Sequence, residues 1–231
     1  MTDRPYTVLS CCISLDGYLD DATAGRLLLS NDLDLDRVDA VRATCDAILV
    51  GAGTIRSDDP RLLVRAPALR AARRADGRDA SPLRVTVTRT GDLDPGARFF
   101  TVGDARRLLY CSSAVVAEAR RRFGAVATVA DGGAAPSMHG VLDDLADRGI
   151  DRLLVEGGGS VLTQCLTAGL ADELHLAVAP VFVGDHLGPR FVGDGRFPWT
   201  SGRRAELIDT CAVGDVALLR YALSDRCTER R

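Results

Sequence analysis

Short apolar runs alternate with longer amphipathic segments along the chain, and this alternation most narrows the folds that the sequence can adopt. Such a pattern is typical of βαβ units, in which helices connect neighbouring parallel strands. It therefore predicts an α/β fold with a largely parallel sheet. The expected strands are Tyr6–Ser14, Asp46–Gly51, Leu83–Thr88, Arg107–Cys111, Ala125–Ala130, Arg152–Glu156, Glu173–Pro180 and Ala212–Leu223.

Four amphipathic segments are expected to form helices, because each begins at a Ser or Asp and three of them are followed by a glycine. They are Asp32–Cys45, Ser113–Phe123, Ser137–Arg148 and Ser160–Ala168. By contrast, Arg65–Ser81 has little apolar periodicity, and we expect an exposed excursion there. Val183–Gly202 is dense in Gly and Pro, and no crossover helix separates the last two strands. The C-terminal strand should therefore be antiparallel, in a hairpin or arm.

Length and composition favour one globular domain over residues 1–231, since 46% of the residues are hydrophobic. The net charge is −3 and the arginines are scattered, which excludes a typical nucleic-acid binder. The apolar run before Asp16 spans only about nine residues and lacks a signal-type cleavage region, so we expect no membrane partner and a cytoplasmic protein. Seven cysteines without a Cys-x-x-Cys pair and three scattered histidines predict no metal and no disulfide framework.

Two glycine-rich segments, Val50–Arg56 and Leu154–Val161, each follow an expected strand directly. Glycines at such a point let backbone N–H groups approach a phosphate, and a helix that starts there adds a favourable dipole. Open α/β sheets bind ligands at the carboxyl ends of their strands, so both turns could border one nucleotide crevice. Neither is the dinucleotide fingerprint, because Arg56 stands where a third glycine belongs. Each alone could also be a simple tight turn.

A more specific pattern lies in five segments: Ile13–Gly17, Cys45–Pro60, Leu154–Ser160, Gly169–Leu174 and Ala179–Gly184. In this order they resemble the pyrimidine reductases of riboflavin biosynthesis, the family of the C-terminal domain of the bifunctional deaminase–reductase. The resemblance covers roughly residues 5–223 and includes no deaminase domain. It implies a three-layer α/β/α, dihydrofolate-reductase-like fold with a mostly parallel sheet and an antiparallel C-terminal strand.

The resemblance also implies a reaction. NADPH would deliver hydride to C1′ of the ring-opened ribosylamino side chain of a pyrimidine 5′-phosphate, giving the ribitylamino product, as in a 5-amino-6-(5-phosphoribosylamino)uracil reductase. It further implies a homodimer, with the Gly169–Gly184 strand and the Gly/Pro-rich arm as interface elements.

Cofactor contacts are implied for both turns and for the end of the third strand. At that strand end, Arg89 would face the 2′-phosphate of NADPH, although a surface arginine is the alternative reading. The other expected contacts are Gly51, Gly53, Thr54 and Asp58 in the first turn and Gly158, Gly159, Ser160, Val161 and Leu162 in the second, within a segment that extends to Gln164.

Substrate contacts are implied for Arg42, Leu62, Arg65 and Glu156. The planar fork of arginine suits phosphate, although Arg42 and Arg65 could also be solvated surface charges. Asp58 could relay a proton or merely cap the turn before Pro60. Glu156 ends a buried strand, where an unpaired carboxylate is costly, so it is expected to face a ligand. Asp58 and Glu156 are the two candidate catalytic residues.

One segment departs from the family. Relatives carry Gly-x-Ser-x-Trp-Ile where this chain has Gly25–Asn31, so Arg26 and Leu28 replace the Ser and the Trp. The exact substrate therefore stays open. One alternative is reduction of dihydrofolate or another pterin or pyrimidine, with an acid supplied by Asp32, Asp34 or Asp36. Another is a non-catalytic nucleotide-binding protein.

Overall fold

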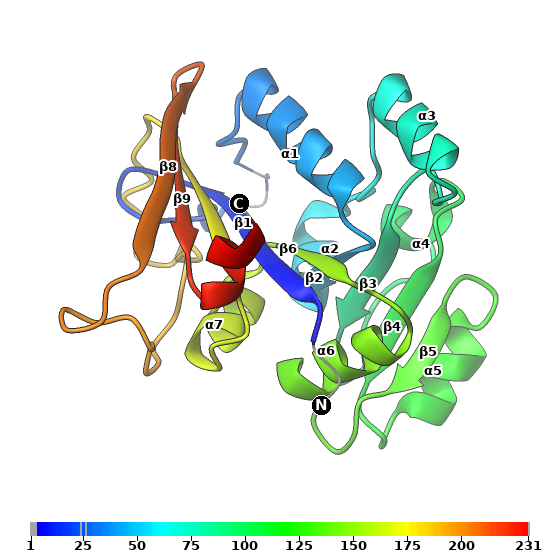
Figure 1. The fold of residues 1–231 in the computed structure, drawn as a ribbon. Helices are drawn as coiled ribbons and strands as arrows, with labels where there is room; N and C mark the ends of the chain where they lie inside the picture. The colour runs from blue at the N-terminus through cyan, green and yellow to red at the C-terminus, as the bar shows by residue number, and fades with distance from the viewer. Residues whose placement is uncertain (1–3, 24, 26, 231) are drawn as a thin grey trace. The chain divides into compact units, whose positions relative to one another are not determined.

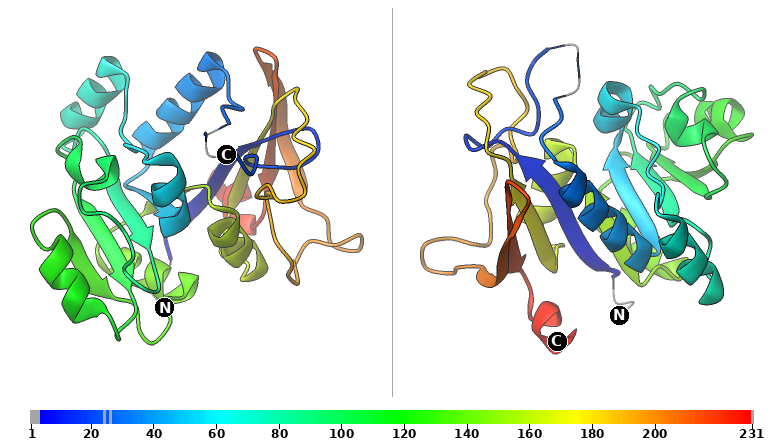
Figure 2. Two further views of the ribbon diagram at one scale, coloured as in Figure 1. Left: turned by 180° about the vertical axis from the view of Figure 1, so that it is seen from behind. Right: turned by 90° about the horizontal axis from the view of Figure 1, so that it is seen from above.

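The computed structural model describes residues 4–23, 25 and 27–230, whose contacts form two compact units. The first unit holds residues 4–5 and 39–154, and the second holds residues 6–38 and 155–230. Helix α1 (Asp32–Thr44) and strand β6 (Arg152–Glu156) each have residues in both units. Each unit is described separately below; Figures 1 and 2 show the elements in colours that follow the chain.

The first unit contains four parallel strands in the spatial order β5, β4, β3, β2. β2 is a continuous apolar run, as a strand with both faces covered requires; Ile48, Leu49 and Val50 are all 0% exposed, whereas β3 also buries Arg84 and Thr86. The strands are β2 (Ala47–Gly51), β3 (Leu83–Val87), β4 (Arg107–Cys111) and β5 (Thr128–Asp131). The helices are α2 (Ala52–Asp58), α3 (Pro67–Ala75), α4 (Arg98–Thr101), α5 (Val116–Phe123) and α6 (Met138–Asp147).

Helix α3 corrects one expectation, since part of the predicted excursion Arg65–Ser81 is helical. Pro67 lies in the first turn of this helix, where its missing N–H costs nothing. The helix is anchored by Arg73, which is only 3% exposed and donates from Nη1 to the carbonyls of Ala43 (2.8 Å) and Cys45 (2.7 Å). Apolar periodicity missed this helix because its buried anchor is an arginine that satisfies carbonyls at the end of α1.

The second unit contains the strand order β1, β7, β9, β8, in which β1 and β7 are parallel and the other neighbours antiparallel. The expected single strand Ala212–Leu223 was wrong, because Gly214 (φ 66°) turns the chain and divides it into a hairpin. Asn31 fixes that turn by donating to the carbonyl of Val213 at 2.7 Å. The elements are β1 (Tyr6–Ile13), α7 (Gly159–Thr167), β7 (Glu173–Val178), β8 (Glu206–Val213), β9 (Val216–Ala222) and the 3₁₀ helix η1 (Asp225–Arg230).

The strand pairings confirm the predicted α/β class, with mostly parallel strands and antiparallel strands at the C-terminus. The four expected helices are all present, with bounds that differ by a few residues. The single domain stays a prediction. None of the helices in the described ranges is both long and apolar enough to cross a membrane.

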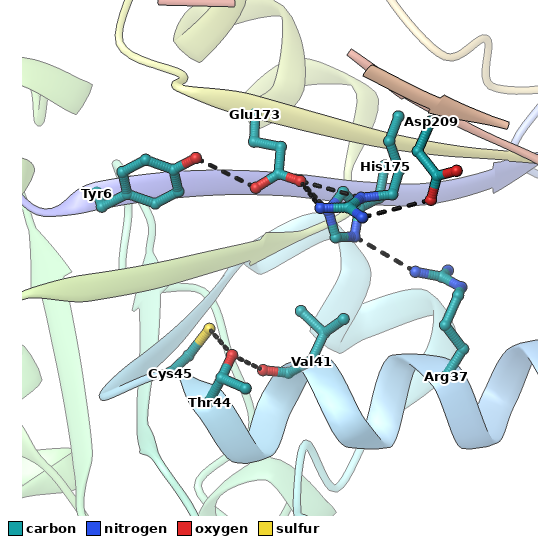
Figure 3. Close-up of polar contacts among 9 residues, drawn as sticks. Tyr6, Arg37, Val41, Thr44, Cys45, Glu173, His175 and Asp209 are labelled. Atoms are coloured by element: carbon teal, nitrogen blue, oxygen red, sulfur yellow. Dashed lines mark hydrogen bonds and ion pairs between the residues drawn. The ribbon is translucent and has the colours of Figure 1, made fainter. Parts of the chain in front are cut away.

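A buried polar cluster joins β7 to its neighbours in the second unit (Figure 3). Glu173 and His175 are 3% and 5% exposed, and the Glu173 carboxylate lies 2.8 Å from His175 Nε2. Arg220 on β9 donates to the same carboxylate oxygen at 2.5 Å, and the Tyr6 hydroxyl donates to the other at 3.2 Å. Arg37 Nη1 lies 3.4 Å from His175 Nδ1. The carboxylate therefore links three neighbouring strands.

The protonation of this cluster follows from its burial. Burial raises the pKa of Glu173, but hydrogen bonds and charge from His175 and Arg220 outweigh it and lower the pKa to about 2. Burial, aided by the charges of Arg220 and Arg37, lowers the pKa of His175 although Glu173 raises it, so the imidazole is neutral at pH 7. A neutral ring that donates from Nε2 to Glu173 keeps Nδ1 as an acceptor for Arg37.

Replacing Glu173 by Gln is expected to lower the free energy of unfolding at pH 7 by about 3 kcal/mol, because it removes the buried partner of Arg220. In the wild type, both lowered pKa values make the unfolded chain bind protons more readily. Stability should therefore fall as the pH drops from about 6.5 toward 2. Thermal and urea denaturation across this pH range measures both effects.

Glu118→Gln is the matched control, since that side chain is 53% exposed and pairs with Arg121 on the same helix. It should change the unfolding free energy by less than about 0.5 kcal/mol. Equal stability of the Glu173 and Glu118 variants at pH 7 would contradict the role given to the cluster.

Candidate active site

The first glycine turn joins β2 to α2. Gly51 ends β2 and caps the helix with extended backbone (φ −72°, ψ 155°), while Ile55 anchors α2 in the core at 3% exposure. Gly53 is exposed, and a Cβ built on it would meet no atom of the described chain within 4 Å. Thr54 is half-buried beside it. The turn therefore presents bare backbone and one hydroxyl, which suits close approach of a ligand.

The segment after α2 has unusual backbone geometry. Asp59 (φ 42°) and Leu62 (φ 46°) are the non-glycine residues with positive φ in the described part of the chain. Leu62 is also buried, at 4% exposure. A bulky residue in this region is strained and persists only where its surroundings hold it, a situation that is common at functional sites. Asp58, which directly precedes Asp59, is half-buried and accepts a hydrogen bond from Ser57.

Asp39 on α1 holds the segment that carries Arg65. Its carboxylate is 1% exposed and accepts the backbone N–H groups of Arg65 (2.7 Å) and Ala66 (2.8 Å). Ser81 accepts the N–H of Val64 at 3.0 Å. The backbone around Arg65 is therefore fixed, while its side chain stays 43% exposed. An exposed guanidinium on a fixed backbone is well suited to bind an anion.

Arg42 is not a solvated surface charge. It is half-buried on α1 and donates from Nη1 to the carbonyl of Leu63 at 3.2 Å. It therefore helps to hold the same segment that Asp39 holds. Sequence reasoning found Arg42 and missed Asp39, although an acid between the apolar Val38 and Val41 was a signal of a buried carboxylate.

Arg89 lies at the end of the strand next to the first turn. Gly51 of β2 is paired with Val87 of β3. The first glycine turn and the segment that carries Arg89 therefore follow neighbouring strand ends. The Arg89 side chain is exposed, while its carbonyl accepts from Ser112 Oγ at 2.8 Å. Thr88 Oγ1 accepts the N–H of Gly91 at 3.1 Å. The first unit thus brings Arg89 to the same edge of the sheet as the first glycine turn.

The second glycine turn joins β6 to α7. Gly157 (φ 80°) and Gly158 (φ 82°) adopt backbone that favours glycine. A Cβ on Gly159 would lie 2.6 Å from the carbonyl oxygen of Arg190, so this position also requires glycine. Each of the three consecutive glycines therefore has a separate steric reason.

The remaining predicted cofactor residues lie on helix α7 and differ in their exposure. Ser160 is exposed and accepts from Gln164 Nε2 at 3.2 Å. Val161 and Leu162 are 6% and 0% exposed, and their N–H groups both donate to the carbonyl of Gly158. These two residues therefore anchor the turn through their buried side chains and their backbone hydrogen bonds. Their direct contact with a cofactor stays a prediction.

Glu156 ends β6 after the fully buried Val155 and is itself half-buried. Its ligand-facing role stays a prediction.

Asp16 is a second acid that sequence reasoning did not single out. Its carboxylate accepts from Ser14 Oγ (2.6 Å) and from the N–H groups of Val183 (3.0 Å) and Gly184 (2.8 Å). The bond from Ser14, aided by these amides, lowers the pKa of Asp16 to about 2. Asp16 therefore joins the Ile13–Gly17 motif to the Ala179–Gly184 motif.

The folate alternative needed an acid on the first turn of α1. Asp32 and Asp36 are exposed, and Asp34 is fully buried in an ion pair with Arg37 at 2.8 Å. Leu28 is 64% exposed, whereas Arg26 lies outside the described residues.

Comparisons with known proteins agree with these motifs. Residues 5–219 match the model of the RibD C-terminal domain family. The chain is 37% identical over 219 residues to 2,5-diamino-6-ribosylamino-4(3H)-pyrimidinone 5′-phosphate reductase of Archaeoglobus fulgidus, covering 94% of this chain and 99% of the relative. The reductase of the same name from Methanothermobacter thermautotrophicus is 33% identical over 226 residues, covering 95% and 99%.

Solved structures agree on the fold. A pyrimidine reductase-like protein from Corynebacterium diphtheriae superposes with a TM-score of 0.82 at 22% identity, covering 94% of this chain and 91% of that one. Dihydrofolate reductase from Enterococcus faecalis gives a TM-score of 0.51 at 13% identity, covering 94% and 95%. The dihydrofolate-reductase-like fold is therefore confirmed.

The family match spans most of the chain, and two reductases of one name align with nearly their full length. This chain belongs to the RibD C-terminal domain family and is an oxidoreductase of the riboflavin-biosynthesis type.

Proposed function

We propose that this chain reduces a ribosylaminopyrimidine 5′-phosphate to its ribitylamino product with NADPH. The observation that carries this proposal is the 37% identity to the reductase of A. fulgidus over 94% of the chain. That relative is named for the 2,5-diamino-pyrimidinone substrate. We therefore favour the diamino compound over its deaminated form.

The two glycine turns are the proposed cofactor contacts, each within its own unit. Gly51, Gly53 and Thr54 would approach the nicotinamide half of the cofactor. Gly158, Gly159 and Ser160 would hold its pyrophosphate, because the start of α7 combines glycine backbone with the positive end of a helix dipole. The turn leaves room for such a group, since Gly157 and Gly158 have positive φ and a Cβ built on Gly157 would meet no atom of the described chain within 4 Å.

Arg89 is the proposed reason for a preference for NADPH. Its exposed guanidinium stands on a strand end whose backbone is fixed by Ser112. A bidentate arginine adds charge-assisted hydrogen bonds to a 2′-phosphate, which NADH lacks.

The substrate phosphate is assigned to Arg65, with Arg42 and Leu62 shaping the segment around it. The bound cofactor would supply hydride to C1′, and the adjacent nitrogen then needs a proton. Asp58 and Glu156 are the proposed carboxyl groups for that proton transfer. Asp58 is half-buried next to Ser57, and Glu156 is half-buried at the end of β6.

The direct test follows NADPH and NADH absorbance with three substrates: the diamino compound, its deaminated form and dihydrofolate. We expect the highest kcat/KM with the diamino compound and NADPH. Turnover with dihydrofolate alone would contradict the proposed substrate. Equal kcat/KM with NADH would remove the role given to Arg89.

Arg65→Ala is expected to lower kcat/KM by roughly 10- to 100-fold, the value of one or two hydrogen bonds to a charged group. The loss should appear chiefly in KM, because the phosphate is remote from C1′. Arg74→Ala, an exposed arginine on α3, is the control and should be unchanged. If the phosphate-free ribosylaminopyrimidine suffers the same loss in Arg65→Ala, then Arg65 does not bind the phosphate.

We also propose a homodimer, with an interface other than the Gly169–Gly184 strand that the sequence predicted. β7 is paired along both edges, with β1 and β9, so the expected Gly169–Gly184 strand has no edge to offer a second copy. β8 is largely exposed on both faces, and Leu207 on it is 49% exposed. An exposed strand with apolar side chains is a ready surface for pairing with another chain.

Light scattering should give a mass near twice the 24.6 kDa of one chain. Leu207→Asp should shift the protein toward the monomer, because it places a charge in the apolar surface of β8. A wild-type monomer at micromolar concentration would disprove the dimer.

A further inference from the structure

A pocket lies at the amino-terminal ends of β3, β4 and β5 in the first unit. Its volume is about 560 Å³, which is within the range of small-molecule sites. Leu83, Leu108 and Ile150 contribute apolar side chains that are 8%, 2% and 7% exposed. Arg106, Arg107 and Arg148 also line it, together with Asp104 and Thr128.

This pocket is distinct from the first glycine turn and from Arg89. Leu83 begins β3, whereas Arg89 follows the end of that strand. Five residues of extended chain separate the two edges by roughly 16 Å. A ligand in the pocket would therefore not occupy the proposed cofactor contacts of this unit.

Arg107 is the most constrained of the three arginines. Its Nη2 donates to the carbonyls of Val102 (3.4 Å) and Gly103, while its buried Nε has no hydrogen-bond partner within the described ranges. Burial lowers the pKa of Arg107, and Asp104 opposes that shift. Backbone carbonyls thus hold the guanidinium at Nη2, while its Nε–H donates no hydrogen bond to the described residues.

The neighbourhood of Arg107 also carries an excess of positive charge. Arg84 is fully buried and donates to the same Val102 carbonyl at 2.9 Å. Burial, and then the charge of Arg107, lowers the pKa of Arg84 to about 10, with Asp104 as the opposing charge. An anion in the pocket would reduce the repulsion between the two guanidinium groups.

Arg106 and Arg148 each form an ion pair with an aspartate, and Arg148 also interacts with Tyr110. Arg106 Nε lies 3.1 Å from Asp79, and these side chains are 75% and 56% exposed. Arg148 Nε lies 2.6 Å from Asp144, with side chains 39% and 40% exposed. A single exposed pair contributes little free energy, so Arg106 can turn toward a stronger anion at low cost, whereas Arg148 is held in place by two contacts to Asp144.

We propose that this pocket binds a small molecule in which a phosphate is attached to an apolar ring system, of about the size of a mononucleotide. The ring lies on Leu83, Leu108 and Ile150, and the phosphate lies on the arginines. Arginine suits this ligand because its fork donates two parallel hydrogen bonds to phosphate oxygens.

The test uses adenosine 5′-monophosphate as the probe, with adenosine and inorganic phosphate as its two halves. Calorimetry should show that the nucleotide binds more tightly than either half. Hydrogen exchange should show slower exchange in residues 104–108 and 126–130 when the nucleotide is present. No binding, or slower exchange confined to residues 51–58 or 157–162, would overturn the proposal.

Variants separate this pocket from the proposed active site. The double variant Arg106→Gln/Arg148→Gln should weaken nucleotide binding by at least about tenfold. Arg121→Gln, a 71% exposed arginine on α5, should bind like the wild type, and so should Arg65→Ala. Unchanged affinity in the double variant, or lost binding in Arg65→Ala alone, would place the nucleotide elsewhere and refute the proposal.

Discussion

The candidate substrate-binding segment around Arg65 depends on one contact. Asp39 binds the backbone of Arg65 and Ala66. Both carboxylate oxygens of a buried acid are used on two successive N–H groups. A buried carboxylate is tolerated only when it is bonded in this way, so the segment cannot leave without a large desolvation cost. The anchor fixes the backbone that carries Arg65, whose side chain is 43% exposed. Charge buried on a helix thus gives a surface loop a fixed shape.

Most of the fold could be predicted because its signals are local. The parallel strands of the first unit are mostly apolar, and the expected Arg107–Cys111 and Arg152–Glu156 have the observed bounds. Two elements were misread for physical reasons. Helix α3 is anchored by Arg73, which an apolar pattern does not register. The turn at Gly214 lies within an apolar run, and it is completed by Asn31 from a distant part of the sequence.

The candidate site was predictable wherever a residue type is required for its own chemistry or shape. The glycines of the second turn are an example, because positive φ and the missing space for a Cβ select glycine directly. The supporting residues were not predictable in this way. Asp39 and Asp16 act by accepting backbone N–H groups, and the sequence identifies neither the partner nor the role of such an acid, even where apolar neighbours indicate that it is buried. The resemblance to a family predicted which residues contact cofactor and substrate, and the structure identified the residues that hold their backbone in place.

The contact between Gly159 and Arg190 has a consequence for how the chain can change over time. The Arg190 guanidinium stacks on Tyr18 with 4.5 Å between its central carbon and the ring centroid, and Gly193 donates to Thr163 on α7 at 2.9 Å. Surface connections usually tolerate insertions and deletions. Here the Gly/Pro-rich arm touches the second turn at fixed points, so a change in its length would displace the helix start that the turn presents. Insertions or deletions between these contacts are therefore expected to disturb the second turn, as a substitution in a core strand would.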